Sequence, residues 1–451
     1  MNRKKLVLIC VLVLSLSSCD RPMQPSESLK PWDSAMVMHL LNSQLTEAVV
    51  QDGFSPPVAS RIYAYTNIAA YETLVGSGDS SKLPSLSGKF PGLELPLPKE
   101  NAGSFDSRVA VVSAFHDVAV EMVYRDYLID SVEVKLLSSL KELVSDPIVY
   151  DRSLQYGKAI AKKIIEWSTK DGYTKTRNLP RYVPTGKVGA WVPTPPTYGE
   201  AVEPYWFRLR PFIMDSASQF SQFPPPEPFS TEKGSSFHNY ALQVYRAGKN
   251  LTEDQIKIAK HWDCNPQVSV IHGHLMGIKR QLTPPGHWIG IVRTVAKEND
   301  LSFGETIDIY TRVSLVMADA FISAWHEKYR SDLIRPETYI NQYIDSNWRP
   351  LLETPLFPEH ISAHSAISRG AAVVLSDFFG DNYSFVDSVE VPFGLPPRRF
   401  ESFIEASDEA AKSRIYGGIH YYPGYQLGVL QGDAIGVFHL NKLKPKKRGG
   451  G

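Results

Sequence analysis

Six residues in the C-terminal half of the sequence have the side chains that oxyanion chemistry requires. They are Lys328, Arg335, Ser362, His364, Arg414 and His420. Guanidinium groups form fork-shaped hydrogen bonds to oxyanions, and an ammonium group supplies a compact positive charge. A hydroxyl and two imidazoles add hydrogen bonding, proton transfer and a nucleophile or metal ligand. This set suits a tetrahedral oxyanion such as phosphate or vanadate.

The segment 357–372 (FPEHISAHSAISRGAA) predicts a loop followed by the start of a helix. Ser362 is placed to cap that helix. Free backbone N–H groups and the positive end of the helix dipole make such a start an anion site. His364, one residue into the helix, could pass a proton to or from an apical oxygen of the bound anion.

Lys328 and Arg335 come from the end of a long predicted helix and from the junction after it. Trp325 and Lys328 are three residues apart, so both can face one pocket. Pro336 suits the first position of a new helix, which places Arg335 where its guanidinium can turn inward.

Arg414 and His420 are six residues apart, which on one straight helix would put them on different faces. Gly417 and Gly418 should break the helix and let both side chains point into one site. His420 is then free to attack phosphorus or to be the sole protein ligand of vanadium.

The elements that must position these residues are predicted to be helices, so the expected fold class is all-α. Apolar residues recur at helical spacing from about residue 33. Further helices are predicted over residues 106–128, 131–144, 149–171, 236–247, 252–262, 286–298, 303–328, 362–379, 399–415 and 420–439. Asp106, Ser131 and Thr252 are the expected helix starts. The chain shows no convincing strand alternation and no internal repeat.

Residues 172–234 contain too much proline for a helix or a central strand, although short strands are possible around residues 188–192. An irregular stretch this long in a compact domain is usually functional or a packed cover. We expect a lid or belt over the helices; the alternative is an exposed linker between two domains.

The first 19 residues are typical of a bacterial lipoprotein signal. A basic start (residues 2–5) and a short apolar run (residues 6–14) precede Leu16-Ser17-Ser18-Cys19, where Cys19 would be lipidated. The alternative is an uncleaved anchor; either way, we expect the cell envelope. A Pro/Ser-rich tether (20–32) would lead to an N-terminal helical region with the Pro-rich lid (33–234). A C-terminal helical region with the site (235–441) and a basic flexible tail (442–451) would follow. Zero net charge gives no case for nucleic acid binding.

The ordered pattern K-x6-R-P, S-x-H and S-R-x5-H over residues 328–420 resembles the vanadium haloperoxidase and type 2 phosphatidic acid phosphatase superfamily. Weaker similarity to exported bacterial haloperoxidase-related proteins lies in residues 191–196, 261–266 and 286–288. The resemblance implies a helical bundle that uses vanadate, not haem. It assigns oxyanion neutralisation to Lys328, Arg335 and Arg414, and hydrogen bonding to Ser362. It assigns acid–base work to His364 and vanadium or phosphoryl ligation to His420. Trp325 and Phe357 match halide-pocket positions.

Two positions depart from the family pattern. Ala363 replaces the usual glycine, so its methyl group could crowd the oxyanion or shift a backbone donor. Gly424 replaces the usual aspartate four residues after the last histidine. That aspartate would fix the tautomer of His420, so His420 should find another partner, such as a backbone carbonyl or a tyrosine.

Three functions fit this pattern. The first is a vanadate-dependent haloperoxidase that oxidises halide with hydrogen peroxide, with phosphate as a competitor of vanadate. The second is a phosphomonoesterase acting on soluble esters through a phosphohistidine at His420. The third is a non-catalytic oxyanion-binding lipoprotein. In each, contact with a membrane is expected through the lipid anchor only.

Other candidate residues favour structural roles. Cys264 is expected to be a buried structural thiol, and no internal disulfide is expected. His272 and His274 lack a third ligand nearby in sequence, so a metal site is not predicted there. Asp263 is either a contact of an active-site arginine or a helix-end carboxylate.

Overall fold

The computed structural model describes residues 34–78, 83–95, 103–221, 224–225 and 227–443. Over these residues the chain forms 14 α-helices. They are α1 (Ser34–Asp52), α2 (Pro56–Gly76), α3 (Ser107–Val120), α4 (Asp126–Leu143), α5 (Pro147–Ser168), α6 (Tyr173–Arg177), α7 (Ser236–Lys249), α8 (Glu253–His261), α9 (Pro284–Glu298), α10 (Phe303–Ser331), α11 (Pro336–Tyr343), α12 (Ala363–Phe379), α13 (Phe403–Tyr416) and α14 (Tyr422–Leu443). Short 3-10 helices are Ser87–Lys89, Trp206–Arg208 and Val391–Phe393. The predicted all-α class is confirmed. Cys19 and the expected signal and tether lie outside the described residues.

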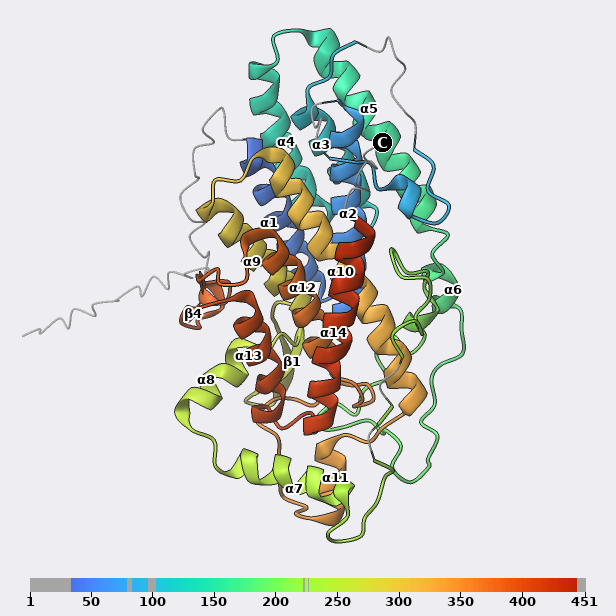
Figure 1. The fold of residues 1–451 in the computed structure, drawn as a ribbon, viewed down its shortest axis with the longest axis vertical. Coiled ribbons are helices and arrows are strands. Elements are labelled where there is room, and N and C mark those ends of the chain that lie inside the picture. The colour runs from blue at the N-terminus through green and yellow to red at the C-terminus, as the bar shows by residue number, and fades with distance from the viewer. Residues whose placement is uncertain (1–33, 79–82, 96–102, 222–223, 226, 444–451) are drawn as a thin grey trace, which may run out of the picture.

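Helices α10, α12 and α14 run through the middle of the elongated molecule (Figure 1). Helices α3, α4 and α5 lie at one end, and α7, α8 and α11 lie at the other. One continuous hydrophobic core runs from Val37 on α1 to Leu443 on α14. Because this core joins distant parts of the chain, it holds the helices that carry the predicted site in a fixed arrangement.

Helices α12 and α14 approach each other closely because α14 has glycine at every fourth position from Gly424 to Gly436. A Cβ atom on Gly428 would lie 2.5 Å from the carbonyl oxygen of Ser362. A Cβ atom on Gly432 would lie 2.3 Å from the carbonyl oxygen of Ala366. Since residues four apart share one helix face, these glycines let α14 contact the backbone of α12 directly.

Some helix starts agree with the prediction and one does not. Asp106 caps α3 by accepting from the N–H groups of Arg108 and Val109. Thr252 caps α8 in a capping box with Gln255. The start predicted at Ser131 is wrong, because α4 begins at Asp126 and the Ser131 hydroxyl donates to the carbonyl of Leu128 inside that helix.

The sequence did not predict the strands. Strands β1 (Gln267–His272) and β2 (Leu275–Arg280) form an antiparallel hairpin, and β3 (Phe385–Asp387) pairs with β4 (Arg398–Phe400). Side chains of the hairpin are exposed on both faces, so no apolar–polar alternation marks it. Near the strands considered at 188–192, the structure has a single bridge between Ala190 and Leu333.

The described part of the proline-rich stretch 172–234 packs against the segments that carry the site through the following bonds. The N–H of Trp191 donates to the carbonyl of Asp332 at 2.8 Å. The N–H of Val202 donates to the carbonyl of Leu356 at 2.9 Å. The carbonyl of Val202 accepts from the Trp325 indole at 3.3 Å and from the Tyr329 hydroxyl at 2.8 Å. These bonds hold this stretch against α10 and the loop before α12.

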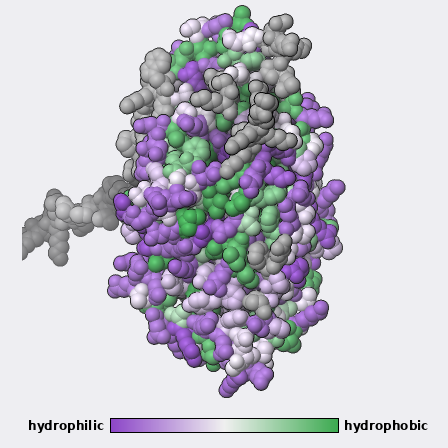
Figure 2. Space-filling view, viewed as in Figure 1, coloured by the Kyte–Doolittle hydropathy of each residue, from purple (hydrophilic) through white to green (hydrophobic). Residues whose placement is uncertain are grey.

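The surface view shows hydrophilic side chains over much of one face, with hydrophobic side chains near its middle, where α14 lies (Figure 2). Leu430 and Val437 on α14 are half-exposed. No helix among the described residues is both long enough and apolar enough to cross a bilayer. α14 continues to Leu443, two residues into the expected tail, and residues 444–451 lie outside the described part.

Candidate active site

Ser362 starts the helix that carries His364. Its hydroxyl oxygen accepts from the Ser365 N–H at 3.2 Å and from the Ser365 hydroxyl at 2.8 Å, so its own proton remains to donate. The helix begins at Ala363, and His364 is its second residue. The predicted cap is confirmed, and the free N–H groups of this helix start lie beside the cavity described next.

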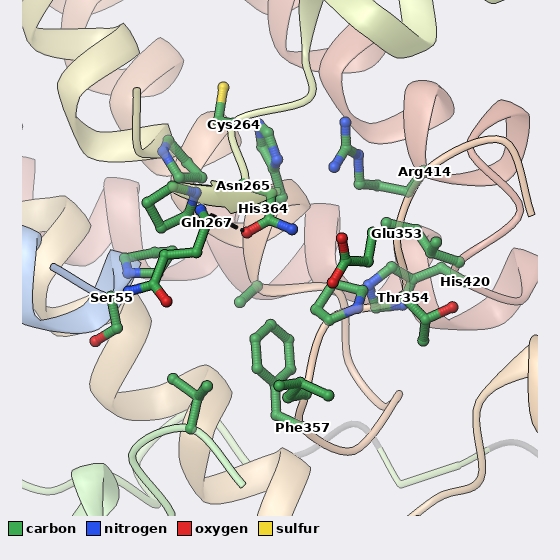
Figure 3. A pocket seen from close by; sticks show the side chains of 18 of the residues that line it. Ser55, Cys264, Asn265, Gln267, Glu353, Thr354, Phe357, His364, Arg414 and His420 are labelled. Carbon is green, nitrogen blue, oxygen red and sulfur yellow. Dashed lines mark hydrogen bonds between the residues drawn. The ribbon is translucent and has the colours of Figure 1, made fainter. Parts of the chain in front are cut away.

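A cavity of about 210 Å³ lies at this helix start (Figure 3). Six of the residues predicted for the site line it: Trp325, Phe357, Ala363, His364, Arg414 and His420. Thr197 and Val202 from the proline-rich stretch also line it. Lys328, Arg335 and Ser362 are fully buried and do not line the cavity. The structure therefore brings the three sequence segments together, with two of the cations behind the cavity wall.

Lys328 acts on the site through its charge. Its ammonium donates to the carbonyls of Pro358, Glu359 and Ile361 at 3.0, 3.1 and 2.6 Å, which uses all three of its protons. Burial, followed by the charge of Arg335, lowers the pKa of Lys328 well below its usual value. A nearby anion would oppose both effects.

Arg335 has one nitrogen available for a ligand. Its Nε donates to the carbonyl of Phe357 at 2.8 Å, and Nη1 donates to that of Ile419 at 2.9 Å. Nη1 also lies 3.3 Å from His420 Nε2. Nη2 is buried and has no hydrogen-bond partner among the described residues. Burial lowers the pKa of Arg335 to about 10.

Two hydrogen bonds hold the Arg414 guanidinium in place at the cavity. Its Nε donates to the Ser413 hydroxyl at 2.9 Å, and Nη2 donates to the carbonyl of Trp262. Asp263 interacts with Arg414 electrostatically: burial raises the pKa of Asp263 to about 6, and Arg414 opposes that shift. Asp263 follows the end of α8, and its backbone N–H donates to the carbonyl of Lys260, so it is a helix-end carboxylate whose charge also acts on Arg414.

His420 lies in the break between α13 and α14, where Gly418 has a φ of +78°. Burial lowers the pKa of His420 well below its usual value, and the charges of Arg335, Lys328 and Arg414 add to this effect. The ring is therefore neutral at neutral pH. Its Nδ1 lies 2.7 Å from Glu359 Oε1. The expected partners, a backbone carbonyl or a tyrosine, were wrong for Nδ1.

His364 is the second neutral histidine of the site. Its Nε2 is buried and unpaired within the described part of the chain. Burial lowers its pKa well below the usual value, and the positive charges of Arg414 and His287 lower it further. A neutral imidazole with a free nitrogen can accept a proton.

Behind His364 lies a buried network of His261, Trp262 and His287, from segments that the sequence analysis named, together with Asp387, which it did not identify. The ring of Trp262 lies 6.2 Å from that of His364 and is stacked on His287 at 4.6 Å. Asp387 Oδ2 lies 2.6 Å from His287 Nε2 and 2.9 Å from His261 Nε2. Asp387 comes from β3, a short strand with no chemical motif, so only the fold brings it here.

Two aromatic rings form the opposite wall. The rings of Trp325 and Phe357 lie 4.9 Å apart. The Lys328 ammonium lies 4.8 Å from the centre of the Phe357 ring, and the Arg335 guanidinium lies 4.9 Å from it. These are cation–π distances, so this wall is apolar yet carries positive charge behind it.

The remaining candidates lie as follows. Cys264 is buried, as predicted, and lines the cavity. His272 and His274 are exposed at the turn of the β1–β2 hairpin, and neither belongs to a potential metal-binding cluster among the described residues.

The arrangement fits a bound oxyanion. Arg414 lines the cavity, Lys328 and Arg335 lie behind its wall, and all three have lowered pKa values. Arg335 Nη2 and His364 Nε2 are buried without partners in the described residues. Buried polar groups are normally paired, so such groups point to a ligand. The fold and the site together define a helical protein built to bind an oxyanion beside two neutral histidines.

Comparisons with known proteins give the family. Residues 308–448 match the family model described as the VCPO second helical-bundle domain. The crystal structure of a bacterial vanadium-dependent iodoperoxidase is similar over 91% of this chain and 96% of that chain, with 42% sequence identity and a TM-score of 0.84. A bacterial vanadium-dependent chloroperoxidase in its holo form covers 87% of this chain and 94% of its own, with 16% identity and a TM-score of 0.62, and supports the fold alone. No curated protein matches the chain. The chain belongs to the vanadium-dependent haloperoxidase family.

Proposed function

We propose that this protein is a vanadate-dependent haloperoxidase that oxidises halide with hydrogen peroxide, with iodide as the first halide to test. The observation that carries this function is the cavity lined by neutral His420, neutral His364 and Arg414, with the positive charges of Lys328 and Arg335 behind its wall. The 42% sequence identity between this chain and a bacterial vanadium-dependent iodoperoxidase supports both the vanadate cofactor and the choice of iodide.

Each residue has a defined part in binding the cofactor. Arg335 Nη2 and Arg414 would donate to the oxygens of vanadate, and the charge of Lys328 would help to neutralise those oxygens. Ser362 would donate its hydroxyl proton, and His420 would offer the lone pair of Nε2. Vanadate, when bound, supplies the Lewis acid that activates hydrogen peroxide.

The protein also handles protons and the halide. His364 accepts a proton from hydrogen peroxide, because its low pKa leaves Nε2 free at neutral pH. Trp325 and Phe357 form an apolar wall suited to a large, weakly hydrated anion such as iodide. The cations behind Phe357 attract that anion into the cavity.

The test uses protein stripped of phosphate, orthovanadate, hydrogen peroxide and iodide or bromide, with a phenol reporter of halogenation. We expect vanadate-dependent halogenation that His420→Ala abolishes and that added phosphate suppresses by competing with vanadate. His274→Ala is the matched control, since His274 is exposed on the hairpin turn. A parallel assay with a chromogenic phosphate ester detects the phosphomonoesterase. Ester hydrolysis inhibited by vanadate, without halogenation, would replace the proposal. No turnover, with vanadate still raising the melting temperature, would identify a binding protein.

We further propose that the protein is exported and anchored to the cell envelope through lipid on Cys19. The support is the basic start, the short apolar run and the Leu-Ser-Ser-Cys sequence of residues 1–19. Mass spectrometry of the mature N-terminus should find a lipid-modified cysteine in the membrane fraction. Cys19→Ala should release unmodified or unprocessed protein; an unchanged mature N-terminus would refute the anchor.

A further inference from the structure

The hydrogen bonds of Glu359 define the tautomer of His420. Glu359 Oε1 lies 2.7 Å from His420 Nδ1 and also accepts from the backbone N–H of Tyr421 at 3.1 Å. Arg335 Nη1, which can only donate, lies 3.3 Å from His420 Nε2, so Nε2 accepts with its lone pair and the neutral ring carries its proton on Nδ1. The proton between the two side chains therefore belongs to Nδ1, and Nε2 keeps its lone pair.

Glu359 and position 424 compete for the same space. A Cβ atom on Gly424 would lie 2.2 Å from Glu359 Oε1 and 2.9 Å from its carboxyl carbon. Any side chain at 424 would therefore displace the Glu359 carboxylate. Position 424 is also where the family pattern has an aspartate, so the carboxylate of Glu359 fills the place that a side chain from α14 would occupy.

The backbone around Glu359 fixes that carboxylate firmly. Its N–H donates to the carbonyl of Leu333 at 2.9 Å, and its carbonyl accepts from the Lys328 ammonium. The side chain is 1% exposed; burial raises the pKa of Glu359 to about 7, and the charges of Arg335 and Lys328 oppose that shift. A glutamate whose backbone and carboxylate are both held in place can orient the neighbouring His420 ring.

We propose that Glu359 is the positioning residue of His420, and that it replaces in space a carboxylate that α14 would otherwise supply at position 424. This inference builds on the proposed function, in which Nε2 of His420 binds vanadate. Glu359 holds the ring so that Nε2 faces the cavity beside Arg335 Nη1. Residues that orient a metal-binding histidine in this way typically change metal affinity or activity by roughly 10–100-fold.

A structural role alone would predict a different result. If Glu359 only neutralised Lys328 and Arg335, its removal would destabilise the protein without changing which nitrogen of His420 carries the proton. The tautomer is therefore the deciding measurement. It can be read from the ¹⁵N shifts of histidine-labelled protein without cofactor, with His420→Ala identifying the resonances.

Four variants make the test: Glu359→Ala, Glu359→Gln, Gly424→Asp and the double variant Glu359→Ala with Gly424→Asp. We expect Glu359→Ala to mix the tautomers and to weaken vanadate binding by roughly 10–100-fold. Glu359→Gln should keep the Nδ1–H form, because its amide oxygen can still accept. Gly424→Asp alone should weaken binding through a clash with Glu359. The double variant should recover the Nδ1–H form and most of the vanadate affinity, measured by calorimetry.

The outcomes separate this inference from the proposed function. Wild-type tautomer and affinity in Glu359→Ala would overturn the inference, as would a double variant no better than Glu359→Ala. If Glu359→Ala fails to fold, the other two single variants still decide. Loss of the Nδ1–H form in Glu359→Gln would overturn the inference. A Gly424→Asp variant that keeps both the Nδ1–H form and the wild-type vanadate affinity would also overturn it. If the wild type does not halogenate but its tautomer depends on Glu359, the positioning role stands and the haloperoxidase function falls.

Discussion

The ring of Phe357 lies 4.9 Å from the ring of Trp325, and the charged groups of Lys328 and Arg335 lie over the Phe357 ring. Phe357 therefore lies between the Trp325 ring and two of the cations. A residue in this place can affect the halide without contacting the oxyanion directly.

Replacing Phe357 with leucine should raise the KM for iodide by roughly 2–30-fold, because cation–π contacts of about 0.5–2 kcal/mol are lost. Vanadate affinity should stay within a few-fold of the wild type, since its donors come from Arg335 and Arg414. Phe220→Leu is the control, because Phe220 packs on Phe438 and does not line the cavity. Steady-state kinetics with iodide would contradict the role of Phe357 if KM were unchanged.

Arg335→Lys should weaken vanadate binding by roughly 10–100-fold, which corresponds to the ~1.5–3 kcal/mol of a hydrogen bond to a charged group. Lysine keeps the charge but cannot reproduce the fork that presents Nη2. Calorimetric titration with vanadate measures the loss. Arg399→Lys, at an exposed arginine that bonds Glu401, should bind as the wild type does. Equal affinity of both variants would show that Nη2 does not donate to the ligand.

Ser362→Ala and Ser402→Ala separate helix capping from ligand binding. Ser402 caps α13 by accepting from the Glu405 N–H at 3.0 Å, and it does not line the cavity. Each substitution should cost about 1 kcal/mol of stability in urea unfolding. Only Ser362→Ala should also weaken vanadate binding, because it removes a hydroxyl donor. Unchanged affinity in Ser362→Ala would limit Ser362 to its capping role.

The pair of His287 and Asp387 gives the protein a pH-dependent part of its stability. Burial disfavours the charged His287 ring, but Asp387 and Cys264 raise its pKa well above the usual value. Burial likewise disfavours the Asp387 carboxylate, but His287 and His261 lower its pKa. The histidine contribution is complete below about pH 6.5 and is lost as pH rises through its folded pKa. The aspartate contribution is complete above about pH 4 and is lost as pH falls through its folded pKa.

Asp387→Asn should therefore destabilise the protein by about 3–5 kcal/mol between roughly pH 4 and 6.5, the cost of breaking a buried ion pair. The difference from the wild type should shrink in more alkaline solution, where His287 loses its proton. Urea unfolding of both proteins at several pH values gives this difference. A difference that does not vary with pH would mean that the pair is not charged in the folded protein.

Residue types and spacing predicted most of the helices and six residues that the structure brings to one cavity, but not all of their contacts. The caps at Asp106, Thr252 and Ser362 followed from the chemistry of helix starts, and the break at Gly417 and Gly418 followed from their lack of side chains. These features depend on neighbours in the sequence, so local patterns contain them.

The contacts that were missed join distant segments. Glu359 lies within a segment whose importance was recognised, yet its bond to His420 crosses 61 positions. Asp387 reaches His287 across 100 positions. Gly424 did signal a missing carboxylate in the sequence. Only the close approach of α14 to the loop before α12 shows that the Glu359 carboxylate occupies the space beside Gly424.

The glycines of α14 also tell a protein engineer where not to vary the chain. Because Gly428 and Gly432 contact the backbone of α12, a bulkier residue there would push away the helix start that carries Ser362 and His364. Libraries that seek new substrates would lose the cofactor site at these positions even though the glycines touch no ligand. Variation belongs at the cavity wall instead, in Thr197, Val202 and the hairpin residues Gln267, Ser269 and Ile278, where side chains can change without moving α12.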